Sequence, residues 1–294
     1  MKKLLMVMNP NAGTRQGKRW MPEIVDRLEK AGYLCTCYLT RRRGDAAHIV
    51  REAGGNADMI LACGGDGTLN EVITGMLQAG HRVQIGYIPC GSTNDFASGL
   101  GIPGEIMKAC ELAATGKPRK LDVGCFGEKR YFSYTASFGA FTSVSYSTSQ
   151  SAKNILGYAA YILEGIRSLT DIRPIHMQIN ADGQLFEDDY IYGGICNSTS
   201  LGGFLKLENG KVHMNDGLFE ALLIPFPTDL IALNRTLTAL RTFDYKDAGL
   251  TFVRAACFEI TGAPGMMWTL DGEAAEAPEH FLIRNLHDAM TMVC

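Results

Sequence analysis

The sequence lacks the features that mark several large classes of protein. No run of about 18 apolar residues occurs, so the sequence predicts no membrane-spanning helix. The nine cysteines form no CxxC pair, which argues against a zinc site and against a disulfide framework. The formal net charge of −3 gives no basic field, and we expect no nucleic-acid partner. The apolar start, residues 1–8, is too short for a signal peptide, which favours a cytoplasmic protein with reduced thiols.

Two familiar phosphate-binding motifs are also absent. Gly17-Lys18-Arg19 lacks the Ser or Thr and the upstream glycine of a P-loop. Gly65-x-Gly67 is not followed by the third glycine of a dinucleotide fingerprint. On these signals the sequence predicts neither a Walker-type ATPase nor a dehydrogenase.

The first third of the chain alternates between apolar strand patterns and amphipathic helix patterns. We expect strands at residues 4–8, 33–39, 59–63 and 83–89, and helices around residues 24–31, 45–53 and 70–78. Continuous apolar strands separated by helices predict a parallel, Rossmann-like sheet that is covered on both faces. Ligands of such sheets bind at the carboxyl ends of the strands.

The pattern changes after about Lys117-Pro118. The later strands alternate in polarity and are joined by turn signals such as Asp182-Gly183, which is typical of antiparallel pairing. We expect strands at residues 175–179, 190–196, 218–224 and 256–261, and a long helix at Ile155–Leu169. The sequence therefore predicts an α/β protein with two domains, residues 1–118 and a β-rich domain over residues 119–284.

Three polar, turn-forming loops follow strands of the predicted parallel sheet: Asn9–Gly13, Gly64–Thr68 and Gly91–Asp95. The second has three glycines within four residues, whereas an ordinary turn needs only one. Glycines followed by a helix start can bring backbone N–H groups against a phosphate. We expect Gly65 and Gly67 to adopt positive φ or to lie against a phosphate oxygen, with Asp66 near a metal. Three such loops at one edge favour a nucleotide site.

Simpler interpretations stay open for the other signals. In the third loop, Ser92, Thr93 or Asn94 could serve simply as the N-cap of the following helix rather than bind a phosphate. Asp271-Gly272 could be a hairpin turn, or it could place two carboxylates at a loop tip together with Glu273. Asp216-Gly217 allows the same two interpretations.

Four motifs together resemble the diacylglycerol kinase catalytic family. They are Gly64-Gly65-Asp66-Gly67-Thr68-Leu69-Asn70-Glu71, Gly91-Ser92-Thr93-Asn94-Asp95-Phe96-Ala97, Asp216-Gly217-Leu218 and Leu270-Asp271-Gly272-Glu273. The resemblance spans nearly the whole chain in the order of the family. It implies a two-domain, NAD kinase-like architecture in which ATP and a lipid meet, and in which the last segment, residues 285–294, returns to the first domain.

The resemblance also implies roles for individual residues. It implies ATP contacts at Asn9, Pro10, Asn11, Ala12, Gly13, Thr40, Gly65, Asp66, Gly67, Thr68, Leu69, Asn70, Glu71 and Thr93. Glu273 resembles the general base, and Asp271 and Asp66 complete the implied catalytic set. His213, Asp216 and Leu218 resemble a structural Mg²⁺ site. Asp66, Asp95 and Asp122 match acidic positions around the magnesium of the reaction.

The resemblance predicts an ATP-dependent lipid kinase that phosphorylates a hydroxyl of a membrane lipid such as diacylglycerol. An NAD kinase-like enzyme and a catalytically silent nucleotide- or lipid-binding regulator are the alternatives. The chain departs from the family at Ser198 and Phe204, where small glycines are usual, so the lipid is left open. We expect reversible, peripheral contact with the inner membrane surface through Arg41–Arg43 or the Ile155–Leu169 helix. A homodimer is left open.

Overall fold

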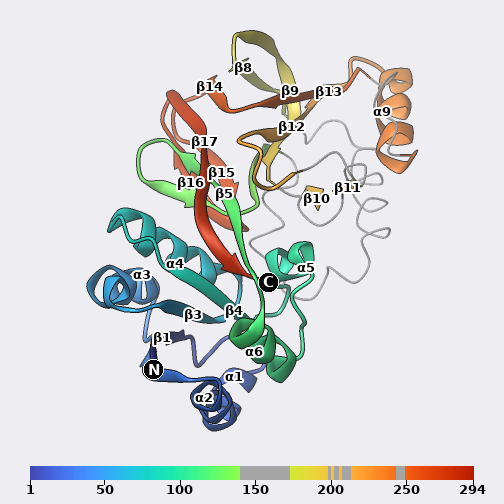
Figure 1. The fold of residues 1–294 in the computed structure, drawn as a ribbon. Helices are drawn as coiled ribbons and strands as arrows, with labels where there is room; N and C mark the ends of the chain where they lie inside the picture. The colour runs from blue at the N-terminus through green and yellow to red at the C-terminus, as the bar shows by residue number, and fades with distance from the viewer. Residues whose placement is uncertain (140–172, 198–199, 202–204, 207–212, 243–248) are drawn as a thin grey trace. The chain divides into compact units, whose positions relative to one another are not determined.

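The computed structural model describes residues 1–139, 173–197, 200–201, 205–206, 213–242 and 249–294 (Figure 1). Contacts divide these residues into two units, Met1–Val123 with His287–Cys294, and Gly124–Leu286. The predicted helix at Ile155–Leu169 and the departures at Ser198 and Phe204 lie outside the described residues. The assignment of residues 1–118 to nucleotide binding and of residues 119–284 to lipid binding stays a prediction.

The first unit is built on a parallel sheet. Its strands are β1 (Lys2–Met8), β2 (Tyr33–Leu39), β3 (Met59–Gly64) and β4 (Gln84–Pro89), in the spatial order β4-β3-β1-β2. The strands β1, β3 and β4 are almost wholly buried, because both of their faces are covered by helices. The predicted α/β class and parallel sheet are confirmed.

Helices cover the two faces of this sheet. They are α1 (Gln16–Arg19), α2 (Met21–Lys30), α3 (Asp45–Ala53), the 3₁₀ turn η1 (Gly54–Asn56), α4 (Asp66–Gln78), α5 (Asp95–Leu100) and α6 (Ile106–Thr115). Figure 1 shows α3 and α4 on one face and α2 and α6 on the other. The start of α4 differs from the expected boundary: α4 begins at Asp66 rather than Asn70. Gly65 is the extended residue before the helix, so Asp66–Leu69 form its first turn.

The second unit is antiparallel, as predicted. The remaining elements are β5 (Pro118–Phe126), β6 (Arg130–Phe132), β7 (Thr135–Gly139), β8 (Ile175–Ala181), β9 (Gln184–Cys196), β10 (Ser200–Leu201), β11 (Leu205–Lys206), β12 (Phe219–Pro225), α9 (Leu230–Thr242), β13 (Thr251–Ala255), β14 (Cys257–Thr261), β15 (Met266–Leu270), β16 (Glu273–Ala277) and β17 (His280–Val293). Asp182 and Gly183 join β8 to β9 with φ of 46° and 94°. Both values are positive, which is the type I′ hairpin turn that Asp-Gly favours.

An aromatic cluster fills the core of the second unit. Trp268 is fully buried, and its ring centroid lies 4.8 Å from that of Phe138 and 5.5 Å from those of Phe126 and Phe281. Such edge and tilted contacts stabilise a core beyond the area they bury. This packing anchors β15, the strand that leads into the Asp271-Gly272-Glu273 turn.

The chain passes between the units through β5 and β17. The end of β17 pairs in parallel with β4, Thr291 opposite Gln84 and Met292 opposite Ile85. All nine cysteines are free thiols, as expected. In the parts of the chain that the structure describes, no helix is long and apolar enough to cross a membrane.

Candidate nucleotide and catalytic sites

The predicted ATP residues of the first unit share one edge of the sheet. Asn9, Thr40 and Gly65 directly follow β1, β2 and β3, whose carboxyl ends all point the same way. The chain leaves β1 to form β2 on one side and β3 on the other, so the order reverses between β1 and β3. Ligands of open α/β sheets bind at this kind of switch point. The structure therefore brings together the predicted groups Asn9–Gly13, Thr40, Gly65–Glu71 and Thr93.

Backbone hydrogen bonds connect the loops at this edge. Asn9 N donates to Cys63 O at 2.8 Å, and Thr40 N donates to Met8 O at 2.9 Å. Within the first loop, the side chain of Asn9 accepts a hydrogen bond from Asn11 N at 3.0 Å. The starts of the loops after β1 and β2 are thus each fixed to the end of a neighbouring strand.

The glycines let the three phosphate-type loops touch backbone to backbone. A Cβ on Gly13 would lie 2.4 Å from Cys90 O, and a Cβ on Gly91 would lie 2.5 Å from the Cα of Gly65. Any side chain at these positions would force the loops apart. Of the two alternatives expected for Gly65 and Gly67, positive φ is wrong: φ of Gly65 is −90°, and Gly67 lies within α4. Contact with a phosphate oxygen stays a prediction. Close approach, rather than left-handed backbone, accounts for Gly65.

Asp66 holds the third loop. Its carboxylate accepts hydrogen bonds from Asp95 N at 3.1 Å and Phe96 N at 3.3 Å, the first amides of α5. Asn94 is one of three residues that could cap α5, but its side chain bonds both N and O of Gly91 at 3.0 Å instead. Asn94 therefore occupies the N-cap position of α5 without a side-chain cap, and Asp66, 29 positions earlier, accepts the bonds from the first amides of the helix.

The side chains of two other residues in the glycine-rich motif, Leu69 and Glu71, contact the protein itself. Leu69 is only 1% exposed, so any contact it makes with a nucleotide comes from its backbone. Glu71 accepts hydrogen bonds from Gly44 N at 2.7 Å and Ala46 N at 3.0 Å, at the start of α3. Sequence reasoning missed this contact, because backbone amides carry no residue-type signal.

One group of side chains among the described residues is close enough to hold a metal ion: Asp122, His287 and Asp288, whose ligand atoms lie within 4.8 Å of one another. Asp122 is fully buried and accepts hydrogen bonds from His287 Nδ1 at 3.0 Å and Asp288 N at 2.7 Å. Lys120 Nζ lies 2.9 Å from Asp288 Oδ2 and already supplies one positive charge. Asp122 is one of the acidic residues that the sequence predicts around magnesium.

Asp95 also fits a cation. Burial raises the pKa of its carboxyl above the usual value, because the ionised form has lost hydration. A nearby positive charge would favour the ionised form again. The donors of the first unit thus suit a magnesium nucleotide, since Mg²⁺ prefers carboxylate oxygen.

In the second unit, Asp271 and Gly272 form a type I′ hairpin turn between β15 and β16, with φ of 48° and 84°. Asp271 is 6% exposed, and its carboxylate accepts hydrogen bonds from Ser133 N, Tyr134 N and Thr135 N at 2.6, 3.0 and 3.1 Å. The turn interpretation is confirmed, and the carboxylate of Asp271 lies against these amides rather than at the loop tip with Glu273. Glu273, half-buried, is the first residue of β16.

The expected structural magnesium site already holds a positive charge. Asp216 Oδ2 pairs with the guanidinium of Arg254, and Asp216 Oδ1 accepts a hydrogen bond from Leu218 N at 3.1 Å. Arg254 Nε also bonds Glu220 Oε1 at 3.0 Å. Burial raises the pKa of Glu220 to about 7, and Arg254 opposes that rise. His213 is exposed.

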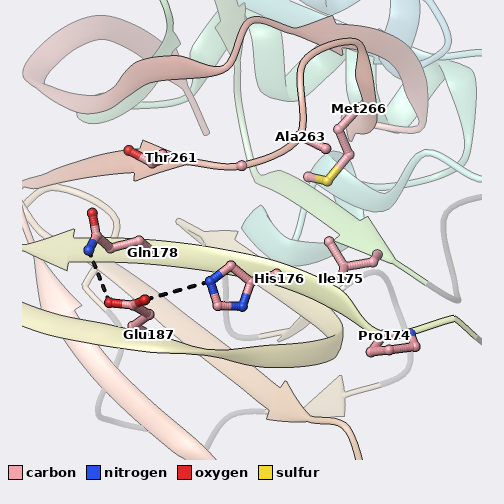
Figure 2. Close-up of a pocket in the computed structure, with 9 residues that line it drawn as sticks. Pro174, Ile175, His176, Gln178, Glu187, Thr261, Ala263 and Met266 are labelled. Carbon is pink, nitrogen blue, oxygen red and sulfur yellow. Dashed lines mark hydrogen bonds and ion pairs between the residues drawn. The ribbon is translucent and has the colours of Figure 1, made fainter.

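A pocket of about 500 Å³ lies on the second unit (Figure 2). Gln178 and His176 of β8 both approach Glu187 of β9, at 3.1 and 3.6 Å, while Met266 lines the opposite side. None of the predicted catalytic, ATP or metal residues lines this pocket.

Comparisons with known proteins identify the family. Residues 3–126 match the diacylglycerol kinase catalytic domain. The diacylglycerol kinase of Bacillus subtilis (strain 168) is 34% identical over 296 residues, covering 99% of this chain and 97% of the relative. The chain belongs to the diacylglycerol kinase family. The family member from Staphylococcus aureus (strain bovine RF122 / ET3-1) is 34% identical over 97% of this chain and 91% of its own length.

The fold agrees with this family. A crystal structure from Bacillus anthracis str. Sterne, named as a candidate diacylglycerol kinase, superposes with a TM-score of 0.81 at 25% identity, covering 99% of this chain and 95% of that one. The predicted family, fold class and enzyme class are confirmed. Membership implies ATP as a substrate, and it leaves the roles of individual residues as proposals.

Proposed function

We propose that the chain is an ATP-dependent lipid kinase that transfers the γ-phosphoryl group to a hydroxyl of a membrane lipid such as diacylglycerol. The observation that carries this proposal is the direct backbone contact of three glycine-containing loops at the switch point of the parallel sheet, in a chain of this family. Phosphoryl transfer depends mainly on positioning and on neutralising charge, which such a backbone cradle provides.

The first unit binds and orients the nucleotide in this proposal. Backbone N–H groups of the Asn9–Gly13 loop and of the first turn of α4 hold phosphate oxygens, since the first amides of a helix lack intrahelical partners. Asp66 keeps the third loop and α5 in place through its two amide contacts. Asp66, Asp95 and Asp122 are the acidic residues that the family resemblance places around Mg²⁺, and of these Asp122 lies with His287 and Asp288 in a group close enough to hold the ion. Mg²⁺ would neutralise the charge of the triphosphate when bound.

The second unit supplies the base. Glu273 accepts the proton of the lipid hydroxyl, which makes the oxygen a better nucleophile. Asp271 acts by positioning: its three amide contacts fix the hairpin on which Glu273 stands. That Glu273 meets the nucleotide loops stays a prediction.

A transfer assay against a panel of alcohols tests the proposal. Labelled ATP is offered with diacylglycerol, monoacylglycerol, a sphingoid base, a ceramide, phosphatidylglycerol and NAD, and the products are separated. We expect label in diacylglycerol or another lipid. Label in NAD alone would favour the NAD kinase-like alternative, and ATP binding without any product would favour the silent regulator.

A magnesium titration tests the proposed metal role of Asp216. If His213, Asp216 and Leu218 bind Mg²⁺, the melting temperature of the protein rises with Mg²⁺ concentration, because a ligand of the folded state stabilises it by mass action. Asp216→Ala is expected to remove most of that rise, while Asp229→Ala serves as a control on another exposed Asp. An identical magnesium response in wild type and Asp216→Ala would leave Arg254 as the sole cation of this turn.

Vesicle flotation tests the proposed location, a cytoplasmic protein that visits the inner membrane surface reversibly. We expect weak binding that strengthens with anionic lipid and falls with salt, since exposed charges are screened over about 10 Å at 0.1 M. Strong binding to neutral vesicles that salt does not change would contradict electrostatic contact and indicate hydrophobic insertion.

A further inference from the structure

Glu71 joins two helices that both start at the nucleotide edge. Its carboxylate lies on the first amides of α3, 2.7 Å from Gly44 N and 3.0 Å from Ala46 N. Glu71 belongs to α4, whose first turn follows Gly65. Both oxygens of the carboxylate are therefore engaged by the backbone of α3, and this geometry differs from the direct ATP contact that the sequence predicts.

Close packing of α3 and α4 makes this contact reachable. Gly75 lies four residues after Glu71 on the same face of α4. A Cβ on Gly75 would lie 2.4 Å from Ala47 O, so the two helices touch backbone to backbone at that point. The approach brings the Glu71 side chain to the N-terminus of α3. A negative charge there interacts favourably with the positive end of the helix dipole.

A second carboxylate fixes the segment between β2 and α3. Asp45 Oδ2 accepts hydrogen bonds from Arg41 N at 2.8 Å and Arg42 N at 3.2 Å. These amides, that of Arg41 first, hold the pKa of Asp45 below its usual value. At the other end of the segment, Thr40 N bonds Met8 O and Thr40 is 9% exposed. The segment Thr40–Gly44 is thus held at both ends and in the middle.

The sheet order places this segment beside the phosphate loops. Strand β2 pairs with β1 on the side away from β3, and neighbouring strands lie about 4.8 Å apart. The loops after β1 and β3 flank the switch point, where ligands of open α/β sheets bind. In dinucleotide-binding sheets of this type a residue about 20 positions beyond the phosphate loop bonds the ribose, and Thr40–Gly44 follow the next strand, β2, in this chain. Arg41–Arg43 belong to this segment, and a guanidinium group can stack on a planar ring. The guanidinium of Arg42 also bonds Asp45 Oδ1 at 3.3 Å.

We propose that Glu71 is a positioning residue that holds Thr40–Gly44 as the wall for the ribose and base of the nucleotide, without touching the phosphates itself. The role depends on the proposed ATP site. The role predicts different effects on the two parts of the nucleotide. Loss of Glu71 weakens binding of the nucleoside, whereas binding of the phosphates by Asn9–Gly13 and Gly65 is unchanged.

Calorimetry with two ligands tests this role. Wild type, Glu71→Ala and Glu71→Gln are titrated with magnesium ATP and with inorganic tripolyphosphate. For Glu71→Ala we expect about a tenfold loss of ATP affinity, about 1.4 kcal/mol, with tripolyphosphate affinity unchanged. Glu71→Gln keeps one acceptor oxygen, so its ATP affinity should lie between those of wild type and Glu71→Ala. Glu52→Ala, which removes an exposed carboxylate from α3, is the matched control and should bind both ligands normally.

Amide hydrogen exchange measures the hydrogen bonds from Gly44 N and Ala46 N to Glu71 without any ligand. The amides of Gly44 and Ala46 should exchange at least about tenfold faster in Glu71→Ala than in wild type, and unchanged exchange would overturn the proposal. Equal loss of affinity for ATP and tripolyphosphate would overturn it too, since Glu71 would then act on the phosphates. Unaltered ATP affinity in Glu71→Ala would refute the positioning role alone, whereas a wild type that binds no ATP would refute the proposed function.

Discussion

Replacing Glu273 by Gln is expected to lower kcat for lipid phosphorylation by a factor on the order of 10² or more, because a carboxamide cannot take the proton of the acceptor hydroxyl. The KM for ATP should change little, since the loops proposed to bind the nucleotide belong to the other unit of the chain. Steady-state kinetics with diacylglycerol in vesicles and varied ATP measures both values.

Glu276→Gln is the matched control for this substitution. Glu276 lies on the same strand, β16, and is exposed, so the same chemical change there should leave kcat unaltered. Near-normal turnover by Glu273→Gln would reject Glu273 as the base. An equal loss in Glu276→Gln would indicate damage to the hairpin rather than loss of a proton acceptor.

Gly13→Ala is expected to abolish measurable ATP binding while the fold survives. The new Cβ would lie 2.4 Å from Cys90 O, so the first and third loops must separate, and φ at this position is +50°. The loops lie at the edge of the sheet, outside its buried core, which is why secondary structure should persist. Calorimetric titration with ATP, together with circular dichroism, measures both properties.

Gly80→Ala separates the effect of close approach from that of backbone strain. Gly80 has φ of +68° and nothing within 4 Å of an added Cβ, so only the left-handed strain of about 1–2 kcal/mol applies. This variant should melt at a lower temperature and bind ATP normally. If Gly13→Ala binds ATP as tightly as Gly80→Ala, the nucleotide lies elsewhere.

Local elements of the first unit could be predicted from the sequence with little error. The predicted strand at residues 33–39 coincides with β2 and the predicted helix at residues 45–53 with α3, because apolar periodicity reports directly which side chains are buried. The Asp182-Gly183 turn was predictable for the same kind of reason, since both residues tolerate positive φ. The predicted start of α4 at Asn70 is wrong because Asp and Gly, at positions 66 and 67, are residue types typical of loops.

The contacts of the motif carboxylates could not be predicted. The sequence predicts that Asp66, Glu71 and Asp271 meet a metal or substrate, and the structure adds that each accepts hydrogen bonds from backbone amides far away in the sequence, 138 positions in the case of Asp271 and Ser133. Every non-proline residue carries such an amide, so no pattern of residue types marks the partner. The same residue type, Asp or Glu, can be a buried carboxylate bonded to amides or an exposed carboxylate that binds a ligand, and the sequence does not distinguish the two.

Transfer of label from ATP to diacylglycerol tests the central claim most directly. The 294-residue protein is incubated with magnesium and with ATP labelled at either the γ- or the α-phosphate. Vesicles that contain diacylglycerol are present, and the lipids are extracted. The account predicts label in phosphorylated diacylglycerol from γ-labelled ATP alone, in wild type and in Glu276→Gln, with a strong reduction in Glu273→Gln. Extracted lipid without label, combined with phosphorylation of NAD or with no ATP consumption, would contradict it.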